Sequence, residues 1–429
     1  MKIFAQSDLT ETKKSETLFV NENSIKQEKA GHKVYKFGFG QSPFLPPAYI
    51  IDELKKTAHR KEYMPVQGLL ELRESAAKFH HDHDHFNITE KNVIVGPGSK
   101  MLIYCCLATL KRADVFLITP SWVSYEPQAQ LAGHPITRLA TSFSNRWRLT
   151  PDQLETACKE RKDTSKPVVM IINYPGNPDG LTYSPEELEA LTDVARKYNV
   201  LIISDEIYGL LHHEAHHVSI AHYYPEGTIV TTGLSKWCGA GGWRLGLAFL
   251  PESWESTFRE SLLGIASETY SCVSSPVQLA GIKAYERTED LDSYLDHQRR
   301  ILSLIGNYVQ QALTKAEVNV HPPDGGFYLN PDFSPLREQL EKRGIFNSDQ
   351  LCEKLLEETG VTLLPGSAFG YPSSRLVTRL AYVDFDGCAA LEASEKIGLS
   401  TPLTSQFMDN YAPKIKAGTQ EIVKWLSNE

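Results

Sequence analysis

The fold is decided by residues 167–206, which read PVVMIINYPGNPDGLTYSPEELEALTDVARKYNVLIISDE. Val168–Ile172 is a short apolar run rich in β-branched residues, and it predicts a buried strand. Ser184 then supplies an N-cap, with a proline directly after it and a glutamate three residues later, which predicts the start of a helix. Val200–Ser204 predicts a second strand. A strand, a helix and a strand in this order form a βαβ unit with parallel strands.

The same alternation of apolar runs and amphipathic helical stretches extends over residues 96–250. Further strands are predicted at Val115–Ile118, Ile229–Thr232 and Leu245–Leu250. These runs show little alternation of polar and apolar residues, as expected of strands that helices cover on both faces. The pattern therefore predicts an α/β protein with a mostly parallel sheet covered by helices.

The chain has 429 residues, which exceeds the usual size of one hydrophobic core, so two domains are expected. After Tyr285 the predicted strands become sparse and helices dominate. We therefore predict a large domain of residues 48–285 and a smaller, discontinuous domain of residues 1–47 and 286–429.

Composition and charge exclude several classes of protein. Lys and Arg number 44 against 53 Asp and Glu, and the formal net charge of -9 argues against a surface that binds nucleic acid. The seven cysteines include no C-x-x-C pair, so a disulfide framework or a zinc ribbon is not indicated. No apolar run approaches the roughly 18 residues of a membrane span, and Met1–Glu16 lacks the core of a signal peptide. We therefore expect a cytoplasmic protein that binds neither nucleic acid nor membrane.

Polar side chains follow three of the predicted strands at the point where each strand ends. Asp205 and Tyr208 follow one strand, Asn177 lies in the turn after another, and Lys236 and Arg244 follow a third. Because ligands of open α/β sheets sit beyond the carboxyl ends of the strands, we expect these groups to converge at one edge.

A lysine, an acid, an amide, a phenol and an arginine at one site suit pyridoxal 5'-phosphate. The lysine binds the cofactor covalently, and the acid keeps the pyridine nitrogen protonated. The amide and the phenol bond the phenolic oxygen of the ring. The glycine-rich run Gly96–Lys100, placed before a helical stretch, would offer backbone N–H groups to the phosphate.

The stretch Gly233–Gly246, GLSKWCGAGGWRLG, resembles the lysine signature of the class I/II aminotransferases, which are fold-type I pyridoxal phosphate enzymes of the aspartate aminotransferase type. The resemblance implies a seven-stranded sheet in the large domain and a smaller α+β domain. It also implies that Lys236 is the covalent lysine and that Arg244 binds the phosphate. The likeness extends over about residues 15–383.

By the same resemblance, Asp205 pairs with the pyridine nitrogen, and Asn177 and Tyr208 bond the phenolic oxygen. Trp122, in the run PSWVSY, resembles the aromatic residue that stacks on the pyridine. Trp122 and Asn177 are also expected to contact the substrate.

The resemblance assigns the phosphate to Gly98, Ser99 and Lys100, besides the arginine already named. Ser235 is a further cofactor residue, although its contact with the phosphate is left open because Gly233 stands where some subfamilies carry a phosphate-binding serine.

Tyr63, in the run YMPVQG, resembles the tyrosine that reaches the phosphate across the dimer interface, which implies a homodimer. Gly40 and Arg379 match the elements that hold the substrate α-carboxylate, with Arg375 as the competing arginine. Gln41–Ser42 departs from the Glu-Pro that commonly follows this glycine, which leaves the contacts of that loop open.

These residues predict an aminotransferase that moves the amino group of an α-amino acid to a 2-oxo acid, with 2-oxoglutarate as the expected acceptor. Lys236 would act as the general base, and the kinetics would be ping-pong through pyridoxamine phosphate. The alternative is a lyase or decarboxylase of the same fold, such as a cysteine-conjugate β-lyase. The donor is not determined by the sequence, and an aspartate type and an aromatic type are both compatible with it.

Two histidine clusters have a metal-binding alternative. His80–His85 ends a predicted amphipathic helix, where we expect a solvated polar run. His213–His217 fits the H-E-x-x-H pattern, but it follows a strand too closely for the long helix that this pattern requires. We therefore predict no metal site.

Overall fold

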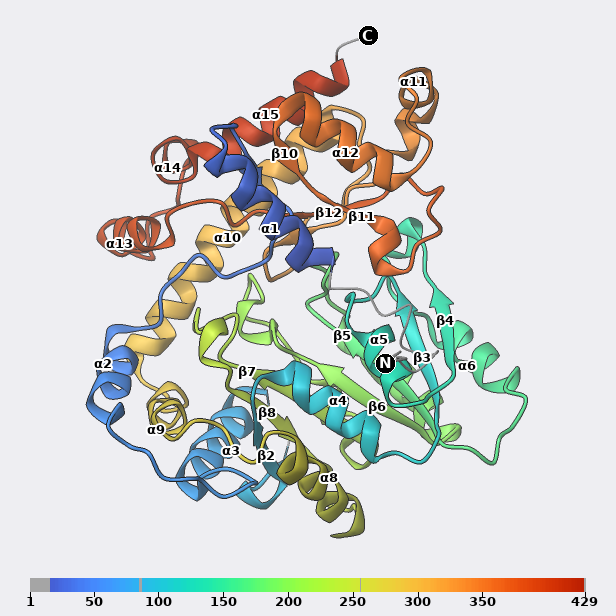
Figure 1. Ribbon diagram of the computed structural model, residues 1–429, viewed down its shortest axis with the longest axis vertical. Helices are drawn as coiled ribbons and strands as arrows, with labels where there is room; N and C mark the ends of the chain where they lie inside the picture. The colour runs from blue at the N-terminus through green and yellow to red at the C-terminus, as the bar shows by residue number, and fades with distance from the viewer. Residues whose placement is uncertain (1–15, 85–86, 255, 428–429) are drawn as a thin grey trace, which may run out of the picture.

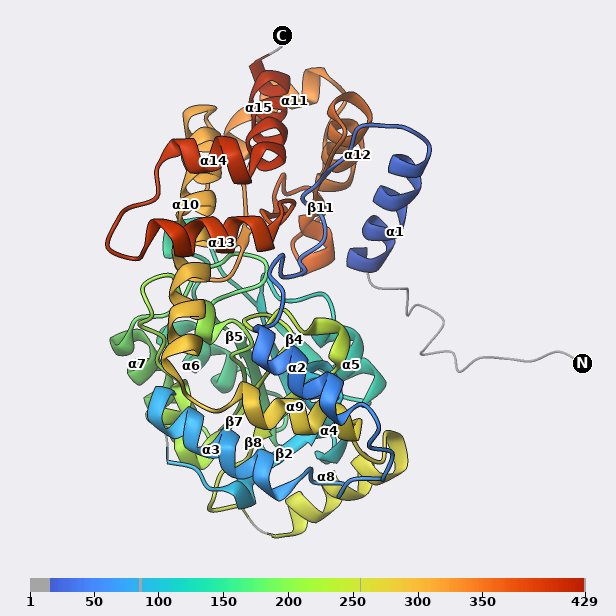
Figure 2. The ribbon, with the colours of Figure 1, turned by 90° about the vertical axis from the view of Figure 1, so that its left-hand side faces the viewer.

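The computed structural model describes residues 16–84, 87–254 and 256–427. Figure 1 shows a lower part built on a central sheet and an upper part made mostly of helices. A long helix, α10 (Glu289–Lys315), runs along both parts (Figure 2). The predicted domain limits, residues 48–285 against the two flanking segments, stay a prediction.

Among the described residues, the central sheet has seven strands in the order β2-β8-β7-β6-β5-β3-β4. They are β2 (Val93–Gly96), β3 (Asp114–Thr119), β4 (Ile136–Ala140), β5 (Val168–Asn173), β6 (Val200–Asp205), β7 (Thr228–Gly233) and β8 (Gly246–Phe249). β8 runs antiparallel to its neighbours β2 and β7, and the other pairs are parallel. The predicted α/β class with a mostly parallel, seven-stranded sheet is confirmed.

Helices cover both faces of this sheet. They are α2 (Ala48–Thr57), α3 (Leu70–Asp84), α4 (Ser99–Thr109), α5 (Tyr125–Leu131), α6 (Pro151–Lys159), α7 (Pro185–Lys197), α8 (Ser256–Thr269) and α9 (Ser275–Ala284). In β5, Val169 and Ile171 belong to the core shared with α4 and α8, whereas Val168 and Met170 belong to the core shared with α6 and α7. Because both faces are buried, the strand is apolar throughout.

The upper part contains the remaining helices and two small sheets. Its helices besides α10 are α1 (Glu16–Lys29), α11 (Arg337–Lys342), α12 (Ser348–Thr359), α13 (Gly387–Ile397), α14 (Ser405–Tyr411) and α15 (Pro413–Ser427). Its strands are β1 (Tyr35–Lys36), β9 (Tyr328–Leu329), β10 (Val361–Thr362), β11 (Leu364–Pro365) and β12 (Thr378–Ala381). β1 pairs with β10, and β12 lies between β11 and β9. Within the described ranges, no helix has the length and apolar character needed to cross a membrane.

The β5–α7–β6 unit forms as predicted because its helix is started by a complete capping box. The Ser184 hydroxyl accepts the Glu187 backbone N–H at 3.2 Å, and the Glu187 carboxylate accepts the Ser184 backbone N–H at 2.8 Å. Strands β2 and β4 were not predicted individually. β2 has four residues, and β4 is an edge strand with mostly exposed side chains, so neither carries a strong pattern.

Replacing Ser184 by alanine should lower the free energy of unfolding by about 1 kcal/mol, because the first turn of α7 loses its side-chain cap. Urea denaturation measures the change. Ser253→Ala, at an exposed turn, is the control and should stay within about 0.5 kcal/mol of the parent. Equal effects of the two substitutions would contradict the capping role.

Candidate active site

A cavity of about 450 Å³ lies at the carboxyl ends of β5, β6 and β7. Most of the predicted site residues line it. They are Gly40, Ser99, Lys100, Trp122, Asn177, Asp205, Tyr208, Ser235, Lys236, Arg244 and Arg379. Gly98 and Tyr63 do not line it. The residues that the sequence scatters over more than 300 positions therefore meet at one place.

Asp205 is the last residue of β6 and is only 3% exposed. The Tyr125 hydroxyl donates to Asp205 Oδ2 at 2.8 Å, and the Thr231 hydroxyl donates to Oδ1 at 3.4 Å. Burial raises the pKa of Asp205 to about 6, and the hydrogen bond from Tyr125 opposes that rise. A cationic N–H of a ligand would offset the cost of ionising this buried acid.

Lys236 lies in the loop after β7, half-buried. Its Nζ donates to the backbone carbonyl of Gly40 at 2.9 Å and lies 5.5 Å from the centroid of the Tyr208 ring. Among the described ion pairs none includes Lys236. The amine is thus held by a neutral acceptor at the cavity wall and is available to an electrophilic ligand.

The predicted phosphate loop joins β2 to the start of α4. Arg244 donates to the Pro97 carbonyl at 3.1 Å and to the Gly241 carbonyl at 2.8 Å. A Cβ at Gly98, whose φ is +91°, would overlap the Arg244 guanidinium, so this glycine makes room for the arginine without lining the cavity itself. Arg244 and Lys100 therefore flank the N-terminus of α4, where an anion is favoured.

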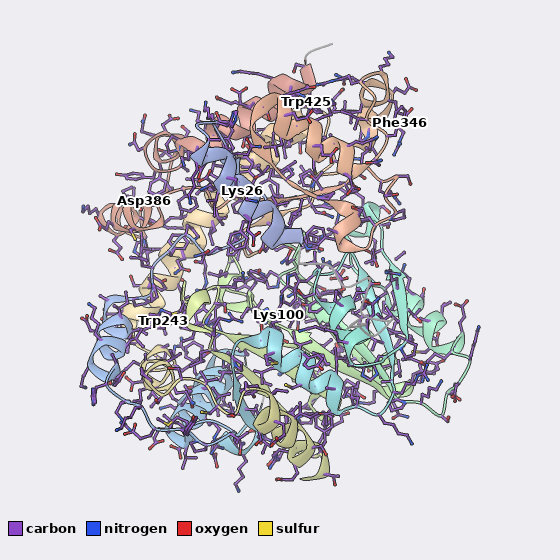
Figure 3. The ribbon with its side chains drawn as sticks, in the orientation of Figure 1. Lys26, Lys100, Trp243, Phe346, Asp386 and Trp425 are labelled. Atoms are coloured by element: carbon purple, nitrogen blue, oxygen red, sulfur yellow. The ribbon has the colours of Figure 1, made fainter. Side chains whose placement is uncertain are left out.

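Lys100 lies at the start of α4, at the end of that helix nearer the upper part of the molecule (Figure 3). Its ammonium group is 5.1 Å from the centroid of the Trp122 ring. Partial burial and the nearby Arg244 charge lower the pKa of Lys100. The described contacts give it no carboxylate partner.

Arg379, in β12, is 1% exposed. It donates to Asn177 Oδ1 at 3.1 Å and to the Gly38 carbonyl at 2.5 Å, and its Nε has no partner among the described atoms. No described carboxylate pairs with it, and burial lowers its pKa. Such a buried cation at a cavity wall fits a carboxylate ligand. The competing Arg375 is exposed and does not line the cavity.

Three residues that hydrogen-bond to the predicted site residues were not themselves predicted. Tyr125 bonds Asp205, Asn173 Nδ2 donates to the Asp205 carbonyl at 2.6 Å, and the Tyr328 hydroxyl accepts from Tyr208 at 3.0 Å. Tyr125 lies three residues after Trp122, and Asn173 directly follows the predicted strand Val168–Ile172, so the sequence could have indicated both residues. Tyr328 had none, because its contact joins two distant segments.

The expectation of a solvated run at His80–His85 is wrong for two of the residues that the structure describes, and His85 lies outside those residues. His80 and Asp84 are buried, and His80 Nδ1 lies 2.5 Å from Asp84 Oδ2. They face the core because α3 packs this end on the sheet, near Phe249. His217 lies in a loop and contacts Glu206 at 2.9 Å. Among the described residues, no group of three or more His, Cys, Asp or Glu side chains is arranged to hold a metal ion.

Asp205→Asn should make the cofactor-free protein more stable than the parent at neutral pH. A raised pKa means that the parent loses stability as Asp205 ionises, between about pH 4 and about pH 6. Above that range the variant should gain about 3 kcal/mol over the parent, from a shift of about two pKa units. Urea denaturation across this range measures the difference, and a difference that does not vary with pH would contradict the burial of a titrating acid.

Comparisons with known proteins find relatives of this chain in sequence and in fold. A curated aspartate aminotransferase of Geobacillus stearothermophilus is 33% identical, over 86% of this chain and 91% of its own. An asparagine–oxo-acid transaminase of Streptococcus mutans is 29% identical, over 87% of this chain and 93% of its own. The crystal structure of an aspartate aminotransferase from Thermotoga maritima is 26% identical and superposes with a TM-score of 0.80, covering 99% of this chain and 100% of that one.

The sequence pattern of the family described as aminotransferase class I and II matches residues 32–384, which is most of the chain. This match includes the lysine loop, the acid of β6 and the arginine of β12. The chain therefore belongs to the class I and II aminotransferase family, which confirms the predicted aminotransferase function.

Proposed function

We propose that this aminotransferase uses pyridoxal 5'-phosphate and takes an α-amino acid with an acidic side chain as donor, with a dicarboxylic 2-oxo acid such as 2-oxoglutarate as acceptor. The observation that carries the proposal is the charge of the cavity. Its described lining residues include four cations, Lys100, Lys236, Arg244 and Arg379, against one carboxylate, Asp205. Such a cavity favours a ligand set with several negative charges.

These cations have separate tasks in the proposal. Arg244 and the N-terminus of α4 receive the cofactor phosphate. Arg379, which is buried and lacks a carboxylate partner among the described residues, receives the α-carboxylate through two parallel hydrogen bonds. Lys100 then remains for a second carboxylate of the substrate. The names of the relatives, aspartate aminotransferase among them, support an acidic donor.

The site fits the cofactor in its polar groups. The residues that would hold it are Ser99, Lys236, Ser235 and Arg244 around the phosphate and the aldehyde, Asp205 at the pyridine nitrogen, Asn177 and Tyr208 at the phenolic oxygen, and Trp122 at the ring face. When bound, pyridoxal phosphate supplies an electron-withdrawing ring that stabilises negative charge at the substrate α-carbon. The buried acid of β6 would stay ionised beside a protonated ring nitrogen.

The residues of the chain perform the proton transfer. Arg379 orients the substrate through its carboxylate, and the bond from Asn177 fixes one edge of the guanidinium. Lys236, whose amine the Gly40 carbonyl holds at 2.9 Å, takes the proton from the substrate α-carbon and would deliver it to the C4′ carbon of the cofactor. Tyr208, Tyr328 and the backbone of Gly40 form a hydrogen-bonded wall beside this amine.

We also propose a homodimer in which Tyr63 reaches the cofactor phosphate of the partner subunit. The Tyr63 side chain is 91% exposed, so it does not pack in the core of its own subunit. Arg244 and Lys100 line the cavity and are themselves exposed. Exposure of a large aromatic side chain together with an open, cationic site supports this arrangement.

Lys236→Ala should lower the rate of amino-group transfer at least about 10³-fold, because the covalent amine and the general base are removed together. Keto acid release from candidate donors measures the rate, and borohydride reduction followed by peptide mapping should place the cofactor adduct on Lys236. Lys283→Ala, at a surface ion pair, is the matched control. Full turnover by the Lys236 variant would refute the assignment.

Lys100→Met should raise KM about tenfold for dicarboxylic donors and leave neutral donors nearly unchanged, because one charged hydrogen bond to the side-chain carboxylate is lost. Comparing the KM of aspartate with that of asparagine isolates the contribution of the side-chain carboxylate. If the lysine binds the phosphate instead, cofactor affinity should fall and both donors should lose activity equally, and this outcome would remove the argument for an acidic donor.

A further inference from the structure

The segment that carries Gly40 is held between two glycines of other segments. Phe44, four residues along, is 2% exposed. A Cβ at Gly239, in the loop of the covalent lysine, would overlap the Phe44 carbonyl oxygen, and a Cβ at Gly387 would overlap the Pro43 carbonyl. The chain around Phe44 is therefore clamped by direct backbone contact on both sides.

The second clamp comes from α13, which starts at Gly387 and so lies beyond the residues that the family pattern matches. The Asp386 side chain caps this helix by accepting two backbone N–H groups, and Figure 3 marks it at the side of the upper part. The Phe385 ring meets the Phe44 ring edge-on, with centroids 5.9 Å apart. Tyr294 of α10 donates to the Leu45 carbonyl at 2.7 Å, so α10 holds the same segment.

The far end of α13 is fastened to α10 by Arg300. Its guanidinium donates to the carbonyls of Ser394 and Gly398 at 2.7 and 2.8 Å, to the Ser394 hydroxyl at 2.7 Å, and to the Thr401 carbonyl at 3.2 Å. His297 of α10 also contacts the Ser394 hydroxyl at 2.8 Å. A charged donor that bonds several carbonyls at a helix C-terminus is a strong anchor. The C-terminal end of α13 is thus bonded to α10, and its N-terminal end packs against Pro43–Phe44.

The clamped segment leads directly into the site. The Gly38 carbonyl accepts from Arg379, and the Gly40 carbonyl accepts from Lys236. Phe39 and Gln41 line the cavity themselves. A displacement of Pro43–Phe44 would therefore move both acceptors, together with part of the substrate wall.

We propose that α13 is a strut that holds residues 38–45 against the site, and that Gly387 and Arg300 are positioning residues for amino-group transfer. The proposal rests on the roles of Arg379 and Lys236 given above. Gly387 sets how closely α13 approaches residues 38–45, and the hydrogen bonds of Arg300 fix the position of α13 on α10. Neither residue touches the cavity.

Kinetic measurements on the cofactor-loaded enzyme test the strut with matched substitutions. Gly387→Ala adds one methyl group that must push the Pro43 carbonyl away, so kcat/KM should fall between about 10- and 100-fold, mainly through KM. Gly264→Ala makes the same change in α8, where nothing lies within 4 Å, and should leave the kinetics unchanged. Arg300→Met should act in the same direction as Gly387→Ala, and Arg300→Lys should recover part of the loss.

Hydrogen–deuterium exchange on the cofactor-free protein tests the strut without any activity. The peptide covering residues 37–47 should exchange faster in Gly387→Ala and in Arg300→Met than in the parent, while peptides of β5 and β6 stay unchanged. If the parent lacks transaminase activity, the proposed function fails and the exchange result still decides the strut.

Two outcomes would overturn the proposal. One is unchanged exchange at residues 37–47 in both variants, with the fold intact by circular dichroism. The other is that kcat and KM both stay unchanged in Gly387→Ala and in Arg300→Met, because the positions of the Gly38 and Gly40 carbonyls would then not depend on α13.

Discussion

The site depends on the register of the parallel strands β5, β6 and β7. Asn173 pairs with Asp205, and Asp205 pairs with Thr231, across three adjacent strands. Parallel strands end at the same edge of the sheet. The pairing of the strands therefore places an amide, a carboxylate and a hydroxyl side by side, and no loop conformation is needed to bring them together. The Asn173 amide and the Thr231 hydroxyl then bond the Asp205 residue that lies between them. A shift of one residue in either pair would turn these side chains to the other face.

Burial keeps two charged groups of opposite sign in the cavity wall without pairing them. Asp205 is bonded by hydroxyls, and Arg379 is bonded by an amide and a carbonyl. Asp205 and Arg379 therefore each carry a buried charge without a partner of opposite charge. This lowers the stability of the folded chain, and a ligand of opposite charge would restore that stability. The same arrangement that weakens the empty protein would orient a substrate carboxylate and a cationic ring.

Close backbone approaches supply the remaining geometry. Gly40 passes under the Tyr328 hydroxyl, Gly98 makes room for Arg244, and Gly387 meets the carbonyl of Pro43. A side chain at any of these positions would separate the segments that form the site. Around the cavity, glycine backbones thus lie against a tyrosine hydroxyl, a guanidinium and a backbone carbonyl, and a displacement of one segment would move the segment packed against it.

Strand periodicity, the capping box and the lysine signature are local patterns, so the sequence was enough to predict the α/β class, the β5–α7–β6 unit and most of the cavity residues. It did not determine the contacts of Tyr328 or the burial of His80 and Asp84, since each depends on which distant surface packs against the residue. It also did not reveal the strut formed by α13. Such contacts are set by the packed fold, because they join segments more than one hundred residues apart, and no local pattern encodes which backbone will lie against a given glycine.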